Sequence, residues 1–171
     1  MNRFVAGIIC ALAAAHYLRA ATNSVGTNVA SVAVTNSADT ELEQIMEADD
    51  AALDEVDKWI RDNQTFAAKG AGESKEDLNK RIRAKLETIR KGYQDFLKRN
   101  PDSARGHLAY GTFINDIGDE ELALAEFETA RKLDPTNPAA WNNCANYYGE
   151  HGPTTNAFVY YAKAIDLNSN E

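Results

Sequence analysis

The side chains most capable of chemistry gather in twelve residues near the end of the chain, WNNCANYYGEHG. Cys144 and His151 there are the residue types of a thiol nucleophile and its base, and with Glu150 they are also zinc ligands. Cys144 and His151 are seven residues apart, which on a helix corresponds to about 10 Å along the axis. That distance is too long for a hydrogen bond or a shared metal ion, so the spacing argues against both sites.

The rest of the chain contains no metal-ligand spacing, nucleophile elbow or phosphate-binding glycine loop. We therefore expect a protein that is not an enzyme and that has no metal and no cofactor. Cys144 is predicted to be buried as a small hydrophobic residue, and an enzyme that uses Cys144 is the least favoured alternative. His151 and Gly152 are expected to end a helix.

The composition narrows the choice of partner. The chain has 171 residues, of which 44% are hydrophobic and 26% charged, and its formal net charge is -8. These values are ordinary for a globular domain. Nucleic acids and anionic membrane surfaces attract basic patches, so we expect no nucleic acid partner, and no membrane contact beyond an export signal.

Residues 1–20 have the pattern of a secretory signal peptide, with a basic start, an apolar run over Phe4–Leu18 and small residues near Ala20. We expect export to the periplasm or the medium after cleavage near Ala20. The run is shorter than the roughly 20 residues of a membrane-spanning helix, and a signal anchor in the inner membrane is the alternative. Cleavage would remove Cys10 and leave Cys144 alone, so no internal disulfide is expected.

Two regions follow the signal. Residues 21–40 are a low-complexity mixture of Thr, Asn, Ser, Val and Ala, which predicts a flexible linker. Residues 41–100 carry two amphipathic helical stripes separated by Gly70–Ser74, which predicts an antiparallel helical hairpin. Ser74 should cap the second helix. Asp49 and Asp50 interrupt the first stripe, so we expect loose first turns there.

An internal repeat of 34 residues follows, because residues 104–137 align with residues 138–171. The turn glycines, the small residues and the large residues coincide between the two copies. The matched pairs are Gly118 and Gly152, Gly111 and Ala145, Ala123 and Ala157, Ala130 and Ala164, Phe127 and Tyr161, Ile114 and Tyr148, and Leu133 and Leu167.

This unit resembles the tetratricopeptide repeat, a helix-turn-helix of the same length with small residues at positions 8, 20 and 27 and bulky ones at 4, 11 and 24. His107 in place of Trp and Ser169 in place of Pro depart from the pattern. The resemblance implies an all-α fold, a helical-hairpin solenoid of two repeats, 104–137 and 138–171. A degenerate first repeat is expected within the long antiparallel helix pair at 41–100.

The resemblance also implies a binding groove on the first helix of each repeat. The positions that face a bound peptide in the family place Asn146 where an asparagine often bonds the ligand backbone. Leu108 and Asn142 stand where the carboxylate-clamp subgroup has lysine, so that specificity is not expected. The implied groove residues are Arg105, Thr112, Asn115, Asn142, Asn146 and Glu150.

The last helix, AFVYYAKAIDL, carries more apolar surface than one side of a helix can hide. Phe158 and Tyr160 are therefore predicted to form a docking face, and a missing capping segment is the alternative explanation. The expected function is non-catalytic binding of a protein or peptide in the groove. The alternative is a structural or assembly subunit of an envelope complex that docks, as a homodimer or on another protein, through the last helix.

Overall fold

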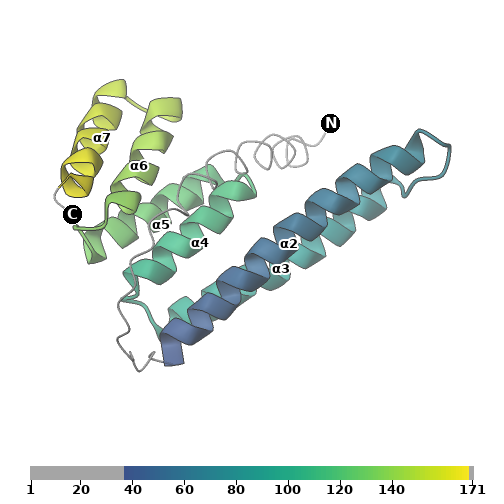
Figure 1. Ribbon diagram of the computed structural model, residues 1–171, viewed down its shortest axis with the longest axis horizontal. Helices are drawn as coiled ribbons and strands as arrows, with labels where there is room; N and C mark the ends of the chain where they lie inside the picture. Colours follow the sequence, from purple (N-terminus) through teal and green to yellow (C-terminus); the bar gives the residue numbers. More distant parts are fainter. Residues whose placement is uncertain (1–36, 170–171) are drawn as a thin grey trace. The chain divides into compact units, whose positions relative to one another are not determined.

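The computed structural model describes residues 37–169, and all the regular structure in that range is helical (Figure 1). The predicted signal peptide, and the linker up to residue 36, lie outside the described residues. The all-α prediction is confirmed for residues 37–169. None of the helices formed there is long and apolar enough to cross a membrane. The helices are α2 (Ser37–Ala67), α3 (Lys75–Arg99), α4 (Ala104–Asp116), α5 (Glu120–Leu133), α6 (Pro138–His151) and α7 (Thr154–Asn168).

The described chain divides into two compact units, the first ending at Asp95 and the second beginning at Phe96. The first unit is a hairpin in which α2 and α3 run antiparallel along each other (Figure 1). Its buried apolar side chains recur at helical spacing on both helices, as the apolar stripes predict. They are Leu42, Ala52, Leu53, Val56 and Ile60 on α2, and Leu78, Ile82, Leu86, Ile89 and Tyr93 on α3.

Helix α2 is longer and more regular than the sequence suggests. It begins at Ser37, inside the predicted linker, and continues without a break through Asp49 and Asp50. The expectation of loose first turns is wrong, because Asp49 faces the hairpin interior. Asp49 is 4% exposed, and its Oδ2 accepts a hydrogen bond of 3.0 Å from the Tyr93 hydroxyl on α3. A buried carboxyl with such a partner is compatible with a continuous helix.

Side-chain hydrogen bonds hold the loop that connects α2 and α3. Ser74 caps α3 as predicted, because its Oγ accepts the Asp77 N–H at 3.1 Å and donates to Asp77 Oδ2 at 2.7 Å. Asn63 binds the loop from the other side: its Oδ1 accepts the Glu73 N–H at 2.7 Å, and its Nδ2 donates to the Glu73 carbonyl at 3.2 Å. Gly70 turns the chain at φ +73°, a conformation that glycine adopts without strain.

The second unit contains two shorter hairpins, α4–α5 and α6–α7, with α6 packed on α5 (Figure 1). The helix starts repeat at an interval of 34 residues, from Ala104 to Pro138 and from Glu120 to Thr154. Local chemistry accounts for the two first helices, because Ser103 caps α4 through the Gly106 N–H and Asn137 caps α6 through the Ala139 N–H.

Small residues allow the helices of the second unit to approach closely. A Cβ on Gly111 would lie 2.7 Å from the Phe127 ring of α5, and one on Gly106 would lie 2.7 Å from the Phe96 ring. Alanines occupy further contact positions and are almost fully buried, so bulky neighbours fill the space beside them. These alanines are Ala123, Ala130, Ala140, Ala145, Ala157 and Ala164.

Candidate functional site

The predicted groove residues of α4 lie on its accessible side. Arg105 and Asn115 are exposed, whereas Thr112 is half-buried. The Thr112 hydroxyl donates to the Leu108 carbonyl of its own helix at 3.0 Å. Its proton is therefore already used, and only the lone pairs of the oxygen remain for another partner.

The predicted groove residues of α6 differ in how much of their hydrogen bonding is engaged. Asn146 is half-buried, and its Oδ1 accepts a hydrogen bond of 2.8 Å from the Tyr161 hydroxyl of α7. That bond fixes the amide so that its NH₂ group can donate to another partner, while its acceptor is shared with Tyr161. Asn142 is half-buried as well, and Glu150 is exposed at the end of the helix.

A polar and aromatic cluster joins α5, α6 and α7. The Tyr160 ring lies 5.4 Å from that of Trp141 and 5.3 Å from that of Tyr148. The Tyr160 hydroxyl donates to Glu128 at 2.9 Å, and Glu128 also accepts from Arg131 at 2.6 Å. Tyr160, which the sequence assigns to the docking face with Phe158, therefore points inward to α5 and α6, because its hydroxyl finds a partner there.

The same cluster controls the protonation of its members. Burial tends to raise the pKa of Glu128, but hydrogen bonds from Arg131 and Tyr160 outweigh it and lower this pKa. Burial, assisted by the carboxylate of Glu128, raises the pKa of the Cys144 thiol to about 12. Cys144 is fully buried, as predicted. A thiol in this state lacks the thiolate character that a nucleophile needs.

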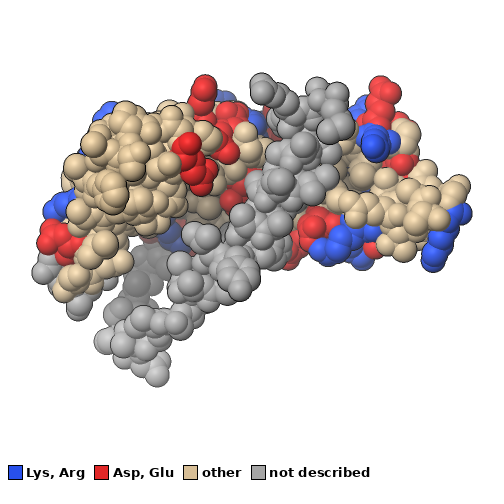
Figure 2. All heavy atoms as spheres, turned by 90° about the horizontal axis from the view of Figure 1, so that it is seen from above, with Lys and Arg blue, Asp and Glu red and all other residues tan. Residues whose placement is uncertain are grey.

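The outer side of α7 is the most apolar exposed surface of the second unit. Phe158, Val159 and Ile165 are 70%, 64% and 66% exposed, respectively. Over residues 138–168 the only Asp, Glu, Lys or Arg residues are Glu150, Lys163 and Asp166. Figure 2 shows mostly uncharged atoms over the end of this unit that α6 and α7 form. Exposed apolar patches of this kind mark interaction surfaces.

The 34-residue alignment of the two hairpins identifies the residues of α5 that correspond to the exposed face of α7. Ala162 and Ile165 of α7 correspond to Glu128 and Arg131 of α5. On α5 these two positions face the next hairpin, since the Arg131 guanidinium lies 4.6 Å from the centre of the Trp141 ring of α6 and Glu128 accepts a hydrogen bond from Tyr160 of α7. Ala162 and Ile165 of α7 are thus exposed at positions where α5 contacts the next hairpin, whereas Ala125, the counterpart of Val159, is exposed on α5 as well.

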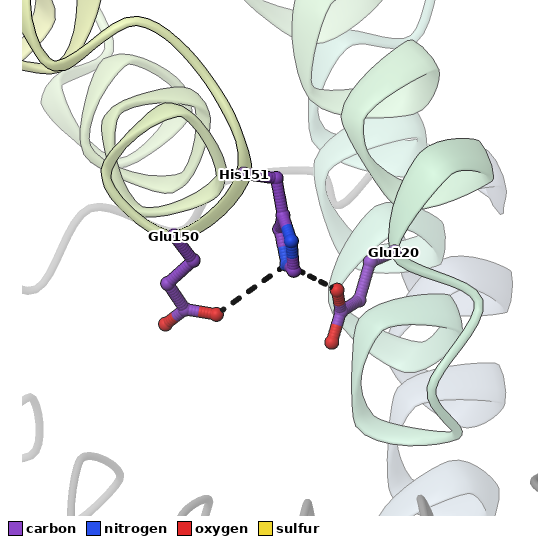
Figure 3. A group of neighbouring side chains, drawn as sticks. All are labelled: Glu120, Glu150 and His151. Carbon is purple, nitrogen blue, oxygen red and sulfur yellow. Dashed lines mark ion pairs between the residues drawn. The ribbon is translucent and has the colours of Figure 1, made fainter.

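A further group lies where α5 begins and α6 ends (Figure 3), and the sequence does not reveal it. Glu120, Glu150 and His151 each bring one possible metal-ligand atom within 4.8 Å of the others. Glu150 and His151 are neighbours in the sequence, but Glu120 is 30 residues away from Glu150. Local spacing cannot indicate a pairing across that separation, whereas the fold brings the two helix ends together.

No family model matches the chain, and no curated protein sequence matches it significantly.

Proposed function

We propose that the protein is a non-catalytic interaction module that binds a helix of another protein on the outer face of α7. This face, called the α7 outer face below, consists of Phe158, Val159, Ala162 and Ile165. The observation that carries the proposal is the exposure of its three large residues, at 70%, 64% and 66%, on a hairpin that carries few charges. Burial of such side chains is the main favourable contribution in protein association.

The counterpart face on α5 indicates the shape of the partner. There, α6 brings Trp141 against Arg131, the counterpart of Ile165. A partner helix laid on α7 in the same way would meet Ala162 and Ile165 in place of Glu128 and Arg131. Because this α7 face is apolar where the α5 face is charged, the partner helix should present an apolar stripe, as in other helix-in-groove complexes.

The second unit is proposed to be a pair of tetratricopeptide-type repeats, with a degenerate repeat before them. Two facts support this assignment: the 34-residue recurrence of helix starts and the burial of small residues at matching positions such as Gly111 and Ala145. The pattern of residues 1–20 supports export of the protein, so the proposed partner lies outside the cytoplasm.

The groove on α4 and α6 is the second candidate surface. It is favoured by Asn146, whose amide is held by Tyr161 with its NH₂ group available to donate. A peptide bound there would lose about 1–2 kcal/mol of binding free energy when Asn146 is replaced by Ala. The two candidates differ in which helix contacts the partner, and this difference can be tested directly.

The test is site-specific photo-cross-linking in cells that produce the full chain. Benzoylphenylalanine is placed at 158 or 165 on the α7 outer face, at 142 in the groove, or at 66. Phe66 is the control, because it is also a large exposed apolar residue, at 54%, and belongs to the first unit. The proposal expects cross-links to the same protein from 158 and 165, with none from 66.

Three results would overturn the assignment. Cross-links from position 142 alone would show that the partner binds in the groove and not on the α7 outer face. Cross-links between copies of this chain, together with a dimer in sedimentation, would make the face a homodimer interface. Equal cross-linking from 158, 165 and 66 would show non-specific contact. In the confirming case, Ile165→Glu should abolish the cross-link from 158 while circular dichroism stays unchanged.

A further inference from the structure

The side chains of Glu120, Glu150 and His151 converge on one point in the second unit (Figure 3). The Nε2 atom of His151 lies 2.5 Å from Glu120 Oε2 and 3.7 Å from Glu150 Oε2. All three side chains remain partly open to water, with exposures of 43% for His151, 44% for Glu120 and 72% for Glu150. An ion at this point would reach solvent without crossing the core.

We propose that these three residues bind one divalent transition-metal ion, such as zinc, and that water molecules complete its coordination. Imidazole nitrogen and carboxylate oxygen are zinc ligands at about 2.0–2.2 Å. A tetrahedron with such bonds separates its ligand atoms by about 3.3–3.5 Å. The contact between His151 and Glu150 is already close to this separation, and Glu120 has to withdraw by about 1 Å.

The helix framework makes that adjustment small. Glu120 is the first residue of α5 and His151 is the last residue of α6, so both side chains project from ordered helix ends. The ring of Tyr147, one turn before His151, lies 5.1 Å from the imidazole and restricts its orientation. The shift of 1 Å therefore falls on the flexible Glu120 side chain.

Charge and donor type select the class of ion. A divalent ion balances the two carboxylates of Glu120 and Glu150, whereas a protonated His151 balances only one. The imidazole ligand favours zinc and its neighbours among the transition metals. Calcium takes six to eight oxygen ligands and magnesium demands an octahedron of oxygens, which a nitrogen and two carboxylates do not provide.

Binding at this point would join the two hairpins of the second unit. Glu120 belongs to the α4–α5 hairpin, whereas Glu150 and His151 belong to the α6–α7 hairpin. A metal ion that links them adds a coordination bridge to the packing of α6 on α5. It should therefore stabilise the folded state by mass action.

The experiment is calorimetric titration of the full chain with zinc chloride, with magnesium and calcium chlorides as ion controls. His151→Gln and Glu120→Gln remove ligands. Glu121→Gln is the matched control, because it removes the same charge from the adjacent exposed position of α5. We expect one ion per chain, and a loss of affinity of at least about tenfold in His151→Gln and Glu120→Gln but not in Glu121→Gln.

Two further measurements do not depend on how the variants fold. Zinc at 100 times its Kd should raise the Tm of the unchanged chain by about 5–10 °C. Zinc should also shift the ring signals of His151 in a nuclear magnetic resonance spectrum and leave those of His107 in place. His107 is the matched histidine, since it contacts the carboxylate of Glu126 at 2.6 Å.

Other outcomes would overturn the proposal. If Glu120→Gln and Glu121→Gln lower the zinc affinity equally, zinc is attracted only by the negative surface charge and is not coordinated by Glu120. Unchanged affinity in His151→Gln, or unchanged His151 ring signals on addition of zinc, would remove the imidazole from the site. Failure of the zinc experiment would leave the cross-linking test of the α7 outer face unaffected, since the two sites share no residue.

Discussion

Replacing Gly111 with alanine tests the close approach of α4 and α5. A Cβ at this position would lie 2.7 Å from both Cδ1 and Cε1 of Phe127 and 3.2 Å from the Cβ of Glu126. Carbon atoms in contact normally lie about 3.5–4.0 Å apart, so the Phe127 ring would have to move by about 1 Å. Phe127 is only 4% exposed and cannot swing into solvent.

Two opposing contributions determine the size of the effect. Overpacking of a buried site typically costs about 1–3 kcal/mol, while exchange of glycine for alanine in a helix gains about 1 kcal/mol. We therefore expect Gly111→Ala to lower the free energy of unfolding by about 1 kcal/mol. A chemically identical exchange in the same unit, Gly149→Ala in α6, would place its Cβ 3.9 Å from Ala157 and Tyr161, an ordinary contact. That variant should gain up to about 1 kcal/mol.

The assay is urea denaturation followed by the fluorescence of Trp141, in a Trp59→Phe background so that the signal reports on the second unit. A difference of about 2 kcal/mol between the two variants corresponds to about 1 M in urea midpoint. If Gly111→Ala is as stable as Gly149→Ala or more stable, the tight packing of α4 on Phe127 is refuted. The close approach of Phe127 would then no longer explain why a small residue occupies position 111.

Three further predictions follow from buried polar groups. Tyr93→Phe withdraws a hydrogen bond from the buried carboxyl of Asp49 and should cost about 1–3 kcal/mol, measured by the Trp59 signal in urea. Burial raises the pKa of Cys144 from 9.0 and that of Tyr160 from 10.0, each to about 12. The unfolded chain releases these protons first, so the stability contributed by these two groups should be complete below pH 9 and fall between pH 9 and 12, and Tyr160→Phe should reduce the loss above pH 10. A disulfide reagent should leave Cys144 unmodified in the folded Cys10→Ser chain at pH 8 and modify it in urea; rapid modification without urea would contradict its burial.

Much of the helical architecture follows from local sequence. The stripe on α3, the Ser74 cap and the glycine turn after α2 depend on residues within one or two helical turns of each other. The same is true of the 34-residue interval between helix starts, because small and large residues recur at matching positions of the two hairpins. The burial of Cys144 was predictable as well, since its counterpart Tyr110 is a packing position that is also buried.

Other features required the fold. In the sequence, Asp49 is a break in an apolar stripe. Only the packing of α2 beside α3 provides the Tyr93 hydroxyl, which donates a hydrogen bond to the buried Asp49 carboxyl. In the sequence, Tyr160 is one of several large residues on a helix with excess apolar surface. In the fold its side chain points inward, because its hydroxyl donates a hydrogen bond to Glu128, 32 residues earlier.

The sequence by itself thus determined where the helices after Ser74 form, which residues are small, and that one helix carries excess apolar surface. Those properties depend on periodicity and on neighbours along the chain. Only the tertiary structure decided which of the α7 side chains are exposed and which carboxylate meets His151. Both depend on packing between helices about 30 residues apart, where each side chain takes the partner that burial and hydrogen bonding allow.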